Sequence, residues 1–370
     1  MKIAIQAADL DAKRIDGTRV YIWNLLKNFG KLAKTDDFFV YHRSDFNPEL
    51  VPPQFGNYKI KKIPLSLSWT QLRFALEIWK DCPDVLWMPM QTLPFIRKRK
   101  LKTIVTIHDL AFKYFPHFFP QKDLHRLNFF SDYAIKNSDK IIAVSESTKN
   151  DILKFYPEIK KEKIKVIYHG FDEANFSNVR NLEKEQELLQ KFGIAKDYIL
   201  YVGAIQPRKN LIILIRAFER IKKENMNLQL VLAGENAWLS DGILDAINGS
   251  DFRDDIKITH RLSFEDVGNL MRGAKVFVFP SLYEGFGLPI LEAFASHVPV
   301  IAANNSSLTE VGGEGALYFD ATNENELADK IKQVLMEEKL RNDLIQKGTE
   351  QLKNFSWIKC ARETLEYLKS

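Results

Sequence analysis

Two glutamates, Glu284 and Glu292, stand eight positions apart in the stretch FPSLYEGFGLPILEAFASHVPV. Between them, Gly285 and Gly287 flank Phe286. Glycine lets the backbone approach a ligand closely, and a carboxylate accepts hydrogen bonds from sugar hydroxyls. The N–H groups at the start of a following helix can hold phosphate oxygens. The stretch is therefore compatible with a site for a sugar, its phosphate and a ribose, but acidic residues also gather at helix N-termini without binding a ligand, so the spacing alone does not decide between the two.

A second set of candidate residues is basic rather than acidic: the pair Arg208 and Lys209, and His108. Arg208 and Lys209 lie in the segment GAIQPRKN, between a predicted strand and a predicted helix. A guanidinium and an ammonium group can neutralise charge that builds on a departing diphosphate, although such a pair in a loop is often only solvated. His108 ends another predicted strand, in TIHD. A strand end favours a functional histidine over a structural one, because ligands of open α/β sheets bind there.

The elements that must position these residues are short apolar runs alternating with amphipathic segments. The runs are rich in Val, Ile, Tyr and Phe, and several are apolar on both faces, which is typical of parallel strands buried between helices. Residues 17–34 and 323–335 show apolar residues at helical spacing. This alternation predicts an α/β fold. The predicted strands are Lys2–Ala7, Phe38–His42, Val85–Met88, Thr103–Ile107, Lys140–Ser145, Lys165–Gly170, Tyr198–Ala204, Leu228–Gly234, Ile256–Thr259, Lys275–Ser281, Pro299–Ala303 and Ala316–Phe319.

A polar and charged stretch, residues 171–193, separates the two series of strands. We place a linker at residues 173–194, between an N-terminal domain of residues 1–172 and a C-terminal domain of residues 195–355. Two successive parallel units predict two Rossmann-like domains that face an interdomain cleft, with ligands at the carboxyl ends of the strands. The tail, residues 356–370, has a helical pattern.

The composition of the chain limits the classes of protein to which it can belong. The 370 residues are 45% hydrophobic and 27% charged, which is ordinary for a globular protein with sizeable cores. The net charge is +5, but residues 1–178 hold 29 Lys and Arg against 20 Asp and Glu, and the remainder holds 24 against 28. A basic half indicates contact with an anionic surface or, equally, solvated lysine-rich helices. Cys82 and Cys360 match no metal spacing and indicate reduced thiols. The N-terminal apolar run is too short for a signal peptide, so we expect a cytoplasmic protein.

The string from Phe277 to Ile331 closely resembles the carboxyl domain of family-4 retaining glycosyltransferases, which have the GT-B fold. Their acid–seven residues–acid motif occurs here as EGFGLPILE, followed by PVIAA, SSLTEV and GGEGALYFD. The resemblance extends over almost the whole chain, through GTRVYIWNLL, TIHDLAFKYFP, IIAVSESTKNDI, KVIYHGFD and YILYVGAIQPRKNL. The pattern is most similar to bacterial mannosyltransferases that build O-antigen and exopolysaccharide chains. The fold implies an acceptor-binding first domain, a donor-binding second domain and a last helix, residues 356–370, that crosses back to the first.

The resemblance implies roles for the residues of the second domain. Glu284 matches the catalytic glutamate, which contacts the transferred sugar. Backbone N–H groups of Gly285, Phe286 and Gly287 match the loop that holds the hydroxyls and phosphate of the donor sugar. Glu292 matches the acid that binds the nucleotide ribose.

The remaining roles concern the diphosphate and the acceptor. Arg208 and Lys209 match the basic pair that grips the donor diphosphate. His108 matches the family's catalytic-site histidine near the donor sugar, where we expect it to position a hydroxyl rather than act as a general base. Gly17 matches the glycine loop that meets the diphosphate and the acceptor.

Three positions depart from the family pattern. Ala204 stands where many members have an arginine, which places more weight on Arg208 and Lys209. Asp16 replaces the usual second glycine beside Gly17, so the contacts of this loop are open. In the predicted base-reading loop, ITHRLSFEDV, the family often has a glycine at His260 or Arg261, which leaves guanine or uracil open.

The implied reaction needs no metal and no cofactor beyond a nucleotide-sugar donor, with GDP-mannose as the first choice and a UDP-sugar as the alternative. The implied acceptor is a glycan or a polyprenyl-linked glycan. A non-catalytic sugar-nucleotide-binding subunit is a second alternative, but the intact set of candidate residues disfavours it. We find no pattern for an epimerase or a phosphorylase.

Other classes fit the sequence less well. Asp9 and Asp11, in DLD, resemble a pair of metal-binding acids, but they follow the first predicted strand without the sequence context of a sugar site. The seven histidines also lack the spacing of metal ligands. The fingerprint of a dinucleotide site is missing after the first strand, which disfavours an NAD enzyme. The basic residues form no recognised nucleic-acid motif, so we expect no nucleic-acid partner.

The basic half also contains segments that suit a membrane surface. FIRKRKLK, residues 95–102, lies in sequence between the aromatic loop of residues 111–120 and a predicted helix that carries Trp69 and Trp79. Basic groups beside exposed aromatics favour a peripheral contact with anionic lipid, at the inner face of the plasma membrane. The alternative is that these aromatic side chains belong to the core.

Overall fold

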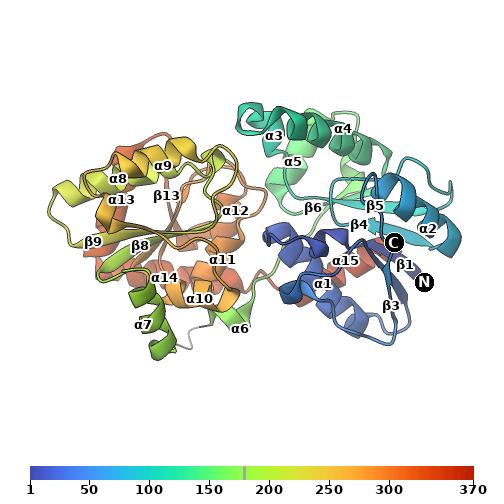
Figure 1. Cartoon of the computed structure of the whole chain (residues 1–370), viewed down its shortest axis with the longest axis horizontal. Helices are drawn as coiled ribbons and strands as arrows, with labels where there is room; N and C mark the ends of the chain where they lie inside the picture. Colours follow the sequence, from blue (N-terminus) through green and yellow to red (C-terminus); the bar gives the residue numbers. More distant parts are fainter. Residues whose placement is uncertain (178–180) are drawn as a thin grey trace. The chain divides into compact units, whose positions relative to one another are not determined.

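The computed structural model describes residues 1–177 and 181–370, and the chain divides into two compact units. Unit 1 comprises Met1–Tyr114, Gln121–Gly170 and Phe355–Ser370. Unit 2 comprises Phe115–Pro120 and Phe171–Asn354. Each unit has a parallel sheet with helices around it (Figure 1), which confirms the predicted α/β class with two Rossmann-like domains.

Within the described residues, the sheet of unit 1 has seven strands in the order β3-β2-β1-β4-β5-β6-β7. All its pairings are parallel, and its central strands are apolar and buried on both faces. The strands that follow β1 in the chain, β2 and β3, lie on one side of it, and the strands that follow β4, β5 to β7, lie on the other side. The carboxyl ends of β1 and β4 are therefore the switch point, where open parallel sheets bind ligands. The strands are β1 (Lys2–Gln6), β2 (Asp37–His42), β3 (Tyr58–Lys62), β4 (Val85–Met88), β5 (Lys102–Ile107), β6 (Lys140–Ala143) and β7 (Ile164–Val166).

Helices cover both faces of this sheet. In Figure 1, α1 and α15 lie on one face, and α3, α4 and α5 lie on the other. A short π-helix, η3 (Thr70–Phe74), leads into α2. The helices of unit 1 are α1 (Gly17–Leu32), α2 (Ala75–Asp81), α3 (Ala111–Tyr114), α4 (Gln121–Asn137), α5 (Glu146–Phe155) and α15 (Trp357–Lys369).

The C-terminal helix α15 is built into unit 1, where it packs on α1. A Cβ added at Gly170 would come within 2.0 Å of the backbone nitrogen of Trp357, so the start of α15 can approach this segment only because residue 170 is glycine. At the other end of the helix, Lys369 forms an ion pair with Asp36. These contacts fix both ends of α15 on unit 1.

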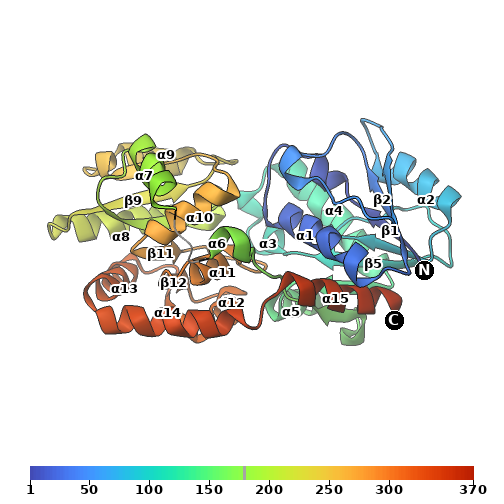
Figure 2. The ribbon, with the colours of Figure 1, turned by 90° about the horizontal axis from the view of Figure 1, so that it is seen from below.

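The sheet of unit 2 has six strands in the described part of the chain, in the order β10-β9-β8-β11-β12-β13, all parallel. Helices α8, α9 and α13 lie on one face, and α10, α11 and α14 lie on the other (Figure 1), with α14 running beside α12 and α13 (Figure 2). The strands are β8 (Asp197–Val202), β9 (Leu228–Ala233), β10 (Ile256–Ile258), β11 (Val276–Phe279), β12 (Val300–Ala303) and β13 (Ala316–Phe319). The helices are α6 (Glu173–Phe176), α7 (Leu182–Lys191), α8 (Leu211–Lys223), α9 (Asp241–Asn248), α10 (Phe264–Gly273), α11 (Leu288–Ala295), α12 (Leu308–Gly312), α13 (Glu324–Met336) and α14 (Glu338–Leu352).

The predicted linker, residues 173–194, contains α6 and α7, and residues 178–180 of this stretch lie outside the described residues. Its described residues are grouped with unit 2 rather than standing apart. The physical reason is that α6 and α7 pack against α10. Arg272 of α10 donates hydrogen bonds to the carbonyl oxygens of Asn175, at 2.9 Å, and Ser177, at 3.1 Å.

Candidate active site

Three adjacent strands of unit 2 bring the predicted donor residues together. β11 pairs with β8 on one side and with β12 on the other. Because the strands are parallel, their following loops meet at one edge of the sheet. The loop after β8 carries Arg208 and Lys209, the loop after β11 carries Glu284, and the loop after β12 carries Ser306 and Ser307.

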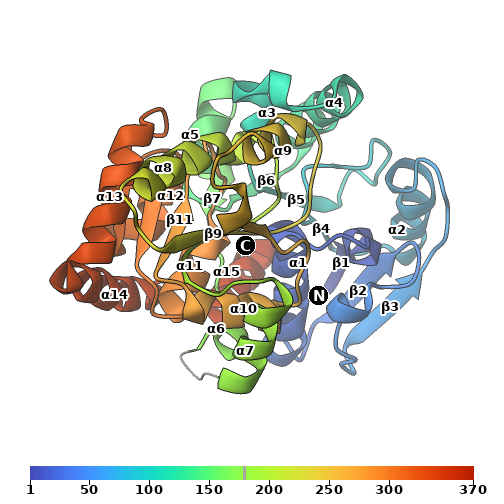
Figure 3. The same cartoon turned by 60° about the vertical axis from the view of Figure 1, so that its left-hand side comes forward.

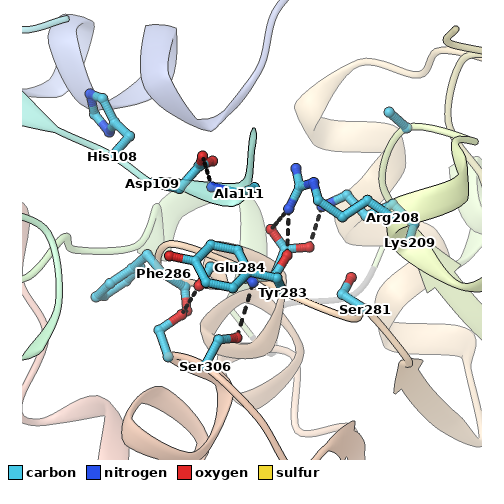
Figure 4. A network of polar contacts seen from close by, with 12 residues as sticks. His108, Asp109, Ala111, Arg208, Lys209, Ser281, Tyr283, Glu284, Phe286 and Ser306 are labelled. Carbon is cyan, nitrogen blue, oxygen red and sulfur yellow. Dashed lines mark hydrogen bonds and ion pairs between the residues drawn. The ribbon is translucent and has the colours of Figure 1, made fainter. Parts of the chain in front are cut away.

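Glu284 lies at the centre of this group (Figure 4). Its Oε1 atom forms an ion pair with Lys209 Nζ, and its Oε2 atom lies 3.3 Å from Arg208 Nη1. Arg208 Nη1 also donates to the carbonyl oxygen of Tyr283. The side chains of Arg208, Lys209 and Glu284 are each more than 80% buried. The structure therefore places the predicted catalytic acid in direct contact with the predicted diphosphate-binding pair.

Two serines of the loop after β12 hold the glycine bend in place. Ser306 Oγ accepts a hydrogen bond from the Glu284 backbone N–H at 3.0 Å. Ser307 Oγ contacts the carbonyl oxygens of Glu284, at 2.9 Å, and Phe286, at 2.8 Å. Gly287 has a φ of 109°, a left-handed conformation that favours glycine, and a Cβ there would meet Leu308 Cδ2 at 3.1 Å. The bend of Gly285, Phe286 and Gly287 thus has a fixed shape at the start of α11.

An asparagine joins the basic loop to its neighbours. Asn210 has a φ of 57°, in the left-handed region that asparagine tolerates. Its side chain donates to the carbonyl oxygens of Pro280, at 3.2 Å, and Ala321, at 2.8 Å. The backbone N–H of Leu282 donates to the Arg208 carbonyl oxygen at 3.0 Å. These bonds fix the basic pair relative to the Glu284 loop before any ligand binds.

The electrostatics of Glu284 follow from these neighbours. Burial by itself would raise the pKa of this carboxyl, but the charges of Lys209 and Arg208 outweigh it and lower the pKa to about 2. Glu284 is therefore ionised at neutral pH, with two cations on it. An ionised carboxylate only accepts hydrogen bonds, which suits contact with sugar hydroxyls.

Glu292 has the opposite electrostatics. It lies in the second turn of α11, where burial and then the charge of Asp172 raise its pKa to about 8. A protonated carboxyl can both donate and accept hydrogen bonds. Paired hydroxyls such as those of a ribose match that capacity, so the role predicted for Glu292 is chemically consistent with its surroundings.

In unit 1, His108 follows β5 at the carboxyl edge of the sheet. Its Nε2 atom lies 2.8 Å from the carbonyl oxygen of Pro89, and the ring of Tyr21 packs on it edge-on at 5.1 Å. Because a carbonyl oxygen only accepts, Nε2 carries the proton, and burial lowers the pKa of the imidazole. Nδ1 is then an acceptor, which suits positioning a hydroxyl. Its neighbour Asp109 accepts from the Ala111 backbone N–H at 3.0 Å (Figure 4).

Gly17 is the first residue of α1, and Asp16 is the cap of that helix. The Asp16 carboxylate accepts from the Arg19 backbone N–H at 3.2 Å and forms an ion pair with the Arg19 guanidinium. Arg19 Nε also donates to the carbonyl oxygen of Asp9 at 3.0 Å. Asp16, which departs from the glycine expected from the resemblance, therefore caps α1 and is bound by Arg19.

The acids of the DLD segment have structural contacts. Asp9 accepts from Gln6 Nε2 at 3.1 Å, and Asp11 accepts from the backbone N–H groups of Arg43, at 2.8 Å, and Ser44, at 2.7 Å. Among the residues that the structure describes, no group of three or more His, Cys, Asp or Glu side chains is arranged to hold a metal ion.

The sequence did not predict that Ser306 and Ser307 hold the glycine bend, or that Asn210 joins the basic loop to its neighbours. Ser306 and Ser307 lie in NNSSL, a polar strand-to-helix loop, and that loop type was the only signal in the sequence. The pairing of β12 with β11, which brings this loop beside the Glu284 loop, is seen only in the structure. In the predicted base-reading loop, His260 has a φ of 57°, a conformation that favours glycine, and the family resemblance led us to expect a glycine at His260 or Arg261.

Comparison with known families places these features in context. The family model described as Glycosyltransferase Family 4 matches residues 15–175, and the model described as Glycosyl transferases group 1 matches residues 184–351. The O-antigen chain mannosyltransferase RfbU of Salmonella typhimurium is 30% identical over 266 residues, which covers 72% of this chain and 68% of RfbU. The chain belongs to glycosyltransferase family 4. A longer alignment joins this glycosyltransferase to O-antigen chain mannosyltransferase B of Escherichia coli, at 29% identity over 376 residues and 96% of each chain.

Solved structures show the same fold. The glycosyltransferase superimposes on sucrose-phosphate synthase from Thermosynechococcus elongatus with a TM-score of 0.79 at 19% identity, covering 100% of this chain and 98% of the other. Anabaena HepE in complex with UDP-glucose gives a TM-score of 0.75 at 16% identity, covering 100% and 99%. These neighbours confirm the GT-B class of the fold. In the described ranges, the glycosyltransferase has no helix whose length and apolar content would let it cross a membrane.

Proposed function

We propose that this glycosyltransferase moves a mannosyl residue from GDP-mannose to a glycan or polyprenyl-linked acceptor, with retention of anomeric configuration, in the synthesis of a cell-surface polysaccharide. The observation that supports the proposal most is the buried group of Glu284, Arg208 and Lys209. The names of the two O-antigen mannosyltransferases support the choice of sugar. The reaction takes place in the cytoplasm, at the inner face of the plasma membrane, where a polyprenyl-linked acceptor is available.

Each donor-site residue has one task. Arg208 and Lys209 hold the diphosphate and offset the negative charge that it gains as it departs. A guanidinium has five N–H donors, so contacts to Glu284 and to a phosphate oxygen are compatible. Glu284 accepts hydrogen bonds from the hydroxyls of the transferred sugar, the bend of Gly285, Phe286 and Gly287 holds the sugar and its phosphate, and Glu292 binds the ribose.

The transfer itself is a front-face substitution. The bond between the sugar C1 and the β-phosphate oxygen breaks, and a bond from C1 to the acceptor oxygen forms on the same face. The acceptor proton passes to the departing phosphate oxygen, so no protein base is needed. His108 positions a hydroxyl of the donor sugar through Nδ1, and Gly17 meets the diphosphate and acceptor. No metal ion takes part, because Arg208 and Lys209 supply the positive charge.

Thermal-shift titration with GDP-mannose, UDP-glucose and ADP-glucose tests the donor. We expect selective stabilisation by GDP-mannose, since a ligand at 100 times its dissociation constant stabilises by about 2.7 kcal/mol. Stabilisation by UDP-glucose alone would indicate another hexose as the transferred sugar, while still supporting the proposed donor site. No shift with any nucleotide sugar would contradict the proposed donor site.

Product analysis tests the stereochemistry, the metal and the catalytic role. NMR of the product from GDP-α-mannose should show an α-mannosyl linkage, in EDTA as well as in magnesium. Lys209→Gln should abolish transfer, whereas the matched control Lys184→Gln, which removes the exposed ion pair with Glu265, should not. Binding of GDP-mannose without any transfer would favour a sugar-nucleotide-binding subunit instead.

A further inference from the structure

One face of the segment η3–α2 in unit 1 is apolar and uncovered. Leu72, Leu76 and Trp79 are spaced by four and three residues, which places them on one side of the helix. They are exposed, whereas Phe74 and Ile78 on the other side are buried. A helix that buries one apolar side and exposes a second has a surface that the rest of its unit does not cover.

Two neighbouring elements extend this face. Phe95 and Ile96 lie in the loop before β5, and the Phe95 backbone N–H donates to Gln71 Oε1 at 2.8 Å. The Phe95 ring packs edge-on against Phe129 of α4 at 5.8 Å. We call Leu72, Leu76, Trp79, Phe95, Ile96 and Phe129 the apolar surface; these side chains are between 40% and 68% exposed. Figure 3 shows α2 and α4 at the periphery of unit 1.

The structure also shows which predicted membrane residues do not belong to this surface. Trp69 is buried, and its indole N–H donates to the Ile63 carbonyl oxygen at 2.7 Å. Phe112 of the predicted aromatic loop is buried as well, and residues 115–120 are grouped with unit 2. Of the aromatic residues that the sequence left open between core and surface, Trp69 and Phe112 therefore belong to the core and Trp79 to the surface.

Basic side chains flank the apolar surface. Lys98 Nζ lies 5.6 Å from the Trp79 ring centroid, and Lys80, Arg99 and Lys100 are exposed beside it. Arg126 is exposed on α4, one turn before Phe129, and lies 3.8 Å from Asp123.

The acids of α2 are compensated inside unit 1. Glu77 is buried and bonds to Arg73 at 2.7 Å, and Asp81 forms an ion pair with Lys61. The charge that the apolar surface presents outward is therefore positive.

We propose that this apolar surface docks on an anionic lipid bilayer, with Leu72, Leu76, Trp79 and Ile96 in the headgroup–acyl boundary and the basic residues on lipid headgroups. A bilayer complements both parts of the surface, because apolar helix faces with flanking Lys and Arg bind at interfaces. A second copy of the chain complements only the apolar part, because it brings the same positive charges face to face. The inference deepens the proposed function, since it brings unit 1 to the membrane that holds a polyprenyl-linked acceptor.

Vesicle flotation tests the proposal with the full chain. We expect binding to vesicles that contain phosphatidylglycerol, little binding to pure phosphatidylcholine, and release at high salt. Leu76→Ser with Trp79→Ser should lower the partition coefficient at least about tenfold, since the double variant removes two apolar side chains from the part of the surface that enters the lipid. Arg99→Glu with Lys100→Glu should also weaken binding to anionic vesicles, with little effect on phosphatidylcholine.

The matched control is Met336→Ser, which removes a 76% exposed side chain from α13 in unit 2 and should leave flotation unchanged. All variants should retain the melting temperature and nucleotide-sugar binding, so failure of this proposal is separate from failure of the proposed function. No flotation of the native protein at low salt, or equal flotation of Leu76→Ser/Trp79→Ser, would overturn it. A dimer that this double variant dissociates would assign the surface to a second copy instead.

Discussion

Replacing Glu284 by glutamine should change the stability of unit 2 in a way that depends on pH. The carboxyl has a pKa of about 2 in the folded chain, against 4.5 for an ordinary glutamate. The difference between these two pKa values corresponds to about 3 kcal/mol. Because the folded pKa is lowered, the contribution is present above pH 4.5 and disappears as the pH falls toward 2; about 2 kcal/mol of it is gone by pH 3.

At neutral pH, Glu284→Gln leaves Lys209 and Arg208 buried without their carboxylate, which costs about 3 kcal/mol or more. We therefore expect the variant to be less stable than the native protein by about 3 kcal/mol at pH 7, and by only about 1 kcal/mol at pH 3. The double variant Glu284→Gln/Lys209→Met should lose less than the sum of the two single variants, since it removes the uncompensated ammonium as well.

Hydrogen exchange of peptides from β8 and β11 measures the opening free energy of unit 2 separately from that of unit 1. The comparison between native protein and variant at each pH cancels the other titrating groups. A stability difference that stays the same from pH 7 to pH 3 would refute the coupling. Additive losses in the double variant would show that Glu284 and Lys209 do not stabilise each other.

Three further predictions concern other parts of the glycosyltransferase. Glu292→Gln should stabilise relative to the native protein at pH 8 more than at pH 5, by melting temperature, because the raised pKa of Glu292 makes the native fold lose stability as the pH rises from 4.5 to about 8. Gly170→Ala should destabilise unit 1 by about 1–3 kcal/mol in urea, because its Cβ meets the Trp357 backbone, whereas Gly56→Ala, with nothing within 4 Å, should be neutral. His108→Gln should lower the transfer rate without altering its profile between pH 7 and 8, because burial lowers the pKa of His108 and keeps it neutral there.

The strands were largely predictable because parallel strands buried on both faces are continuous apolar runs. Each of the twelve runs predicted from the sequence overlaps a strand of the two sheets, although Lys165–Gly170 shares only Lys165 and Val166 with β7. The strand that sequence reasoning missed is β3, whose YKIKK alternates lysine with apolar residues because it lies at the edge of its sheet. The helix predicted over residues 17–34 is α1, Gly17–Leu32.

The candidate site was predictable in its residue types but not in its internal contacts. Strand-to-helix position and family resemblance identified Glu284, Arg208 and Lys209, and the structure brings these three together. Their mutual ion pairs could not be read from the sequence, because they depend on β8 and β11 being neighbours in the sheet. For the same reason the supports from Ser306 and Ser307 on β12's loop went unnoticed.

The central claim is tested most directly by measuring transfer with GDP-mannose and a mannose-terminated acceptor. The native glycosyltransferase should release GDP and form mannosylated product in equal amounts, and Lys209→Gln should form neither. Product formed at the native rate by Lys209→Gln, or no product from any nucleotide sugar with the native protein, would contradict the account.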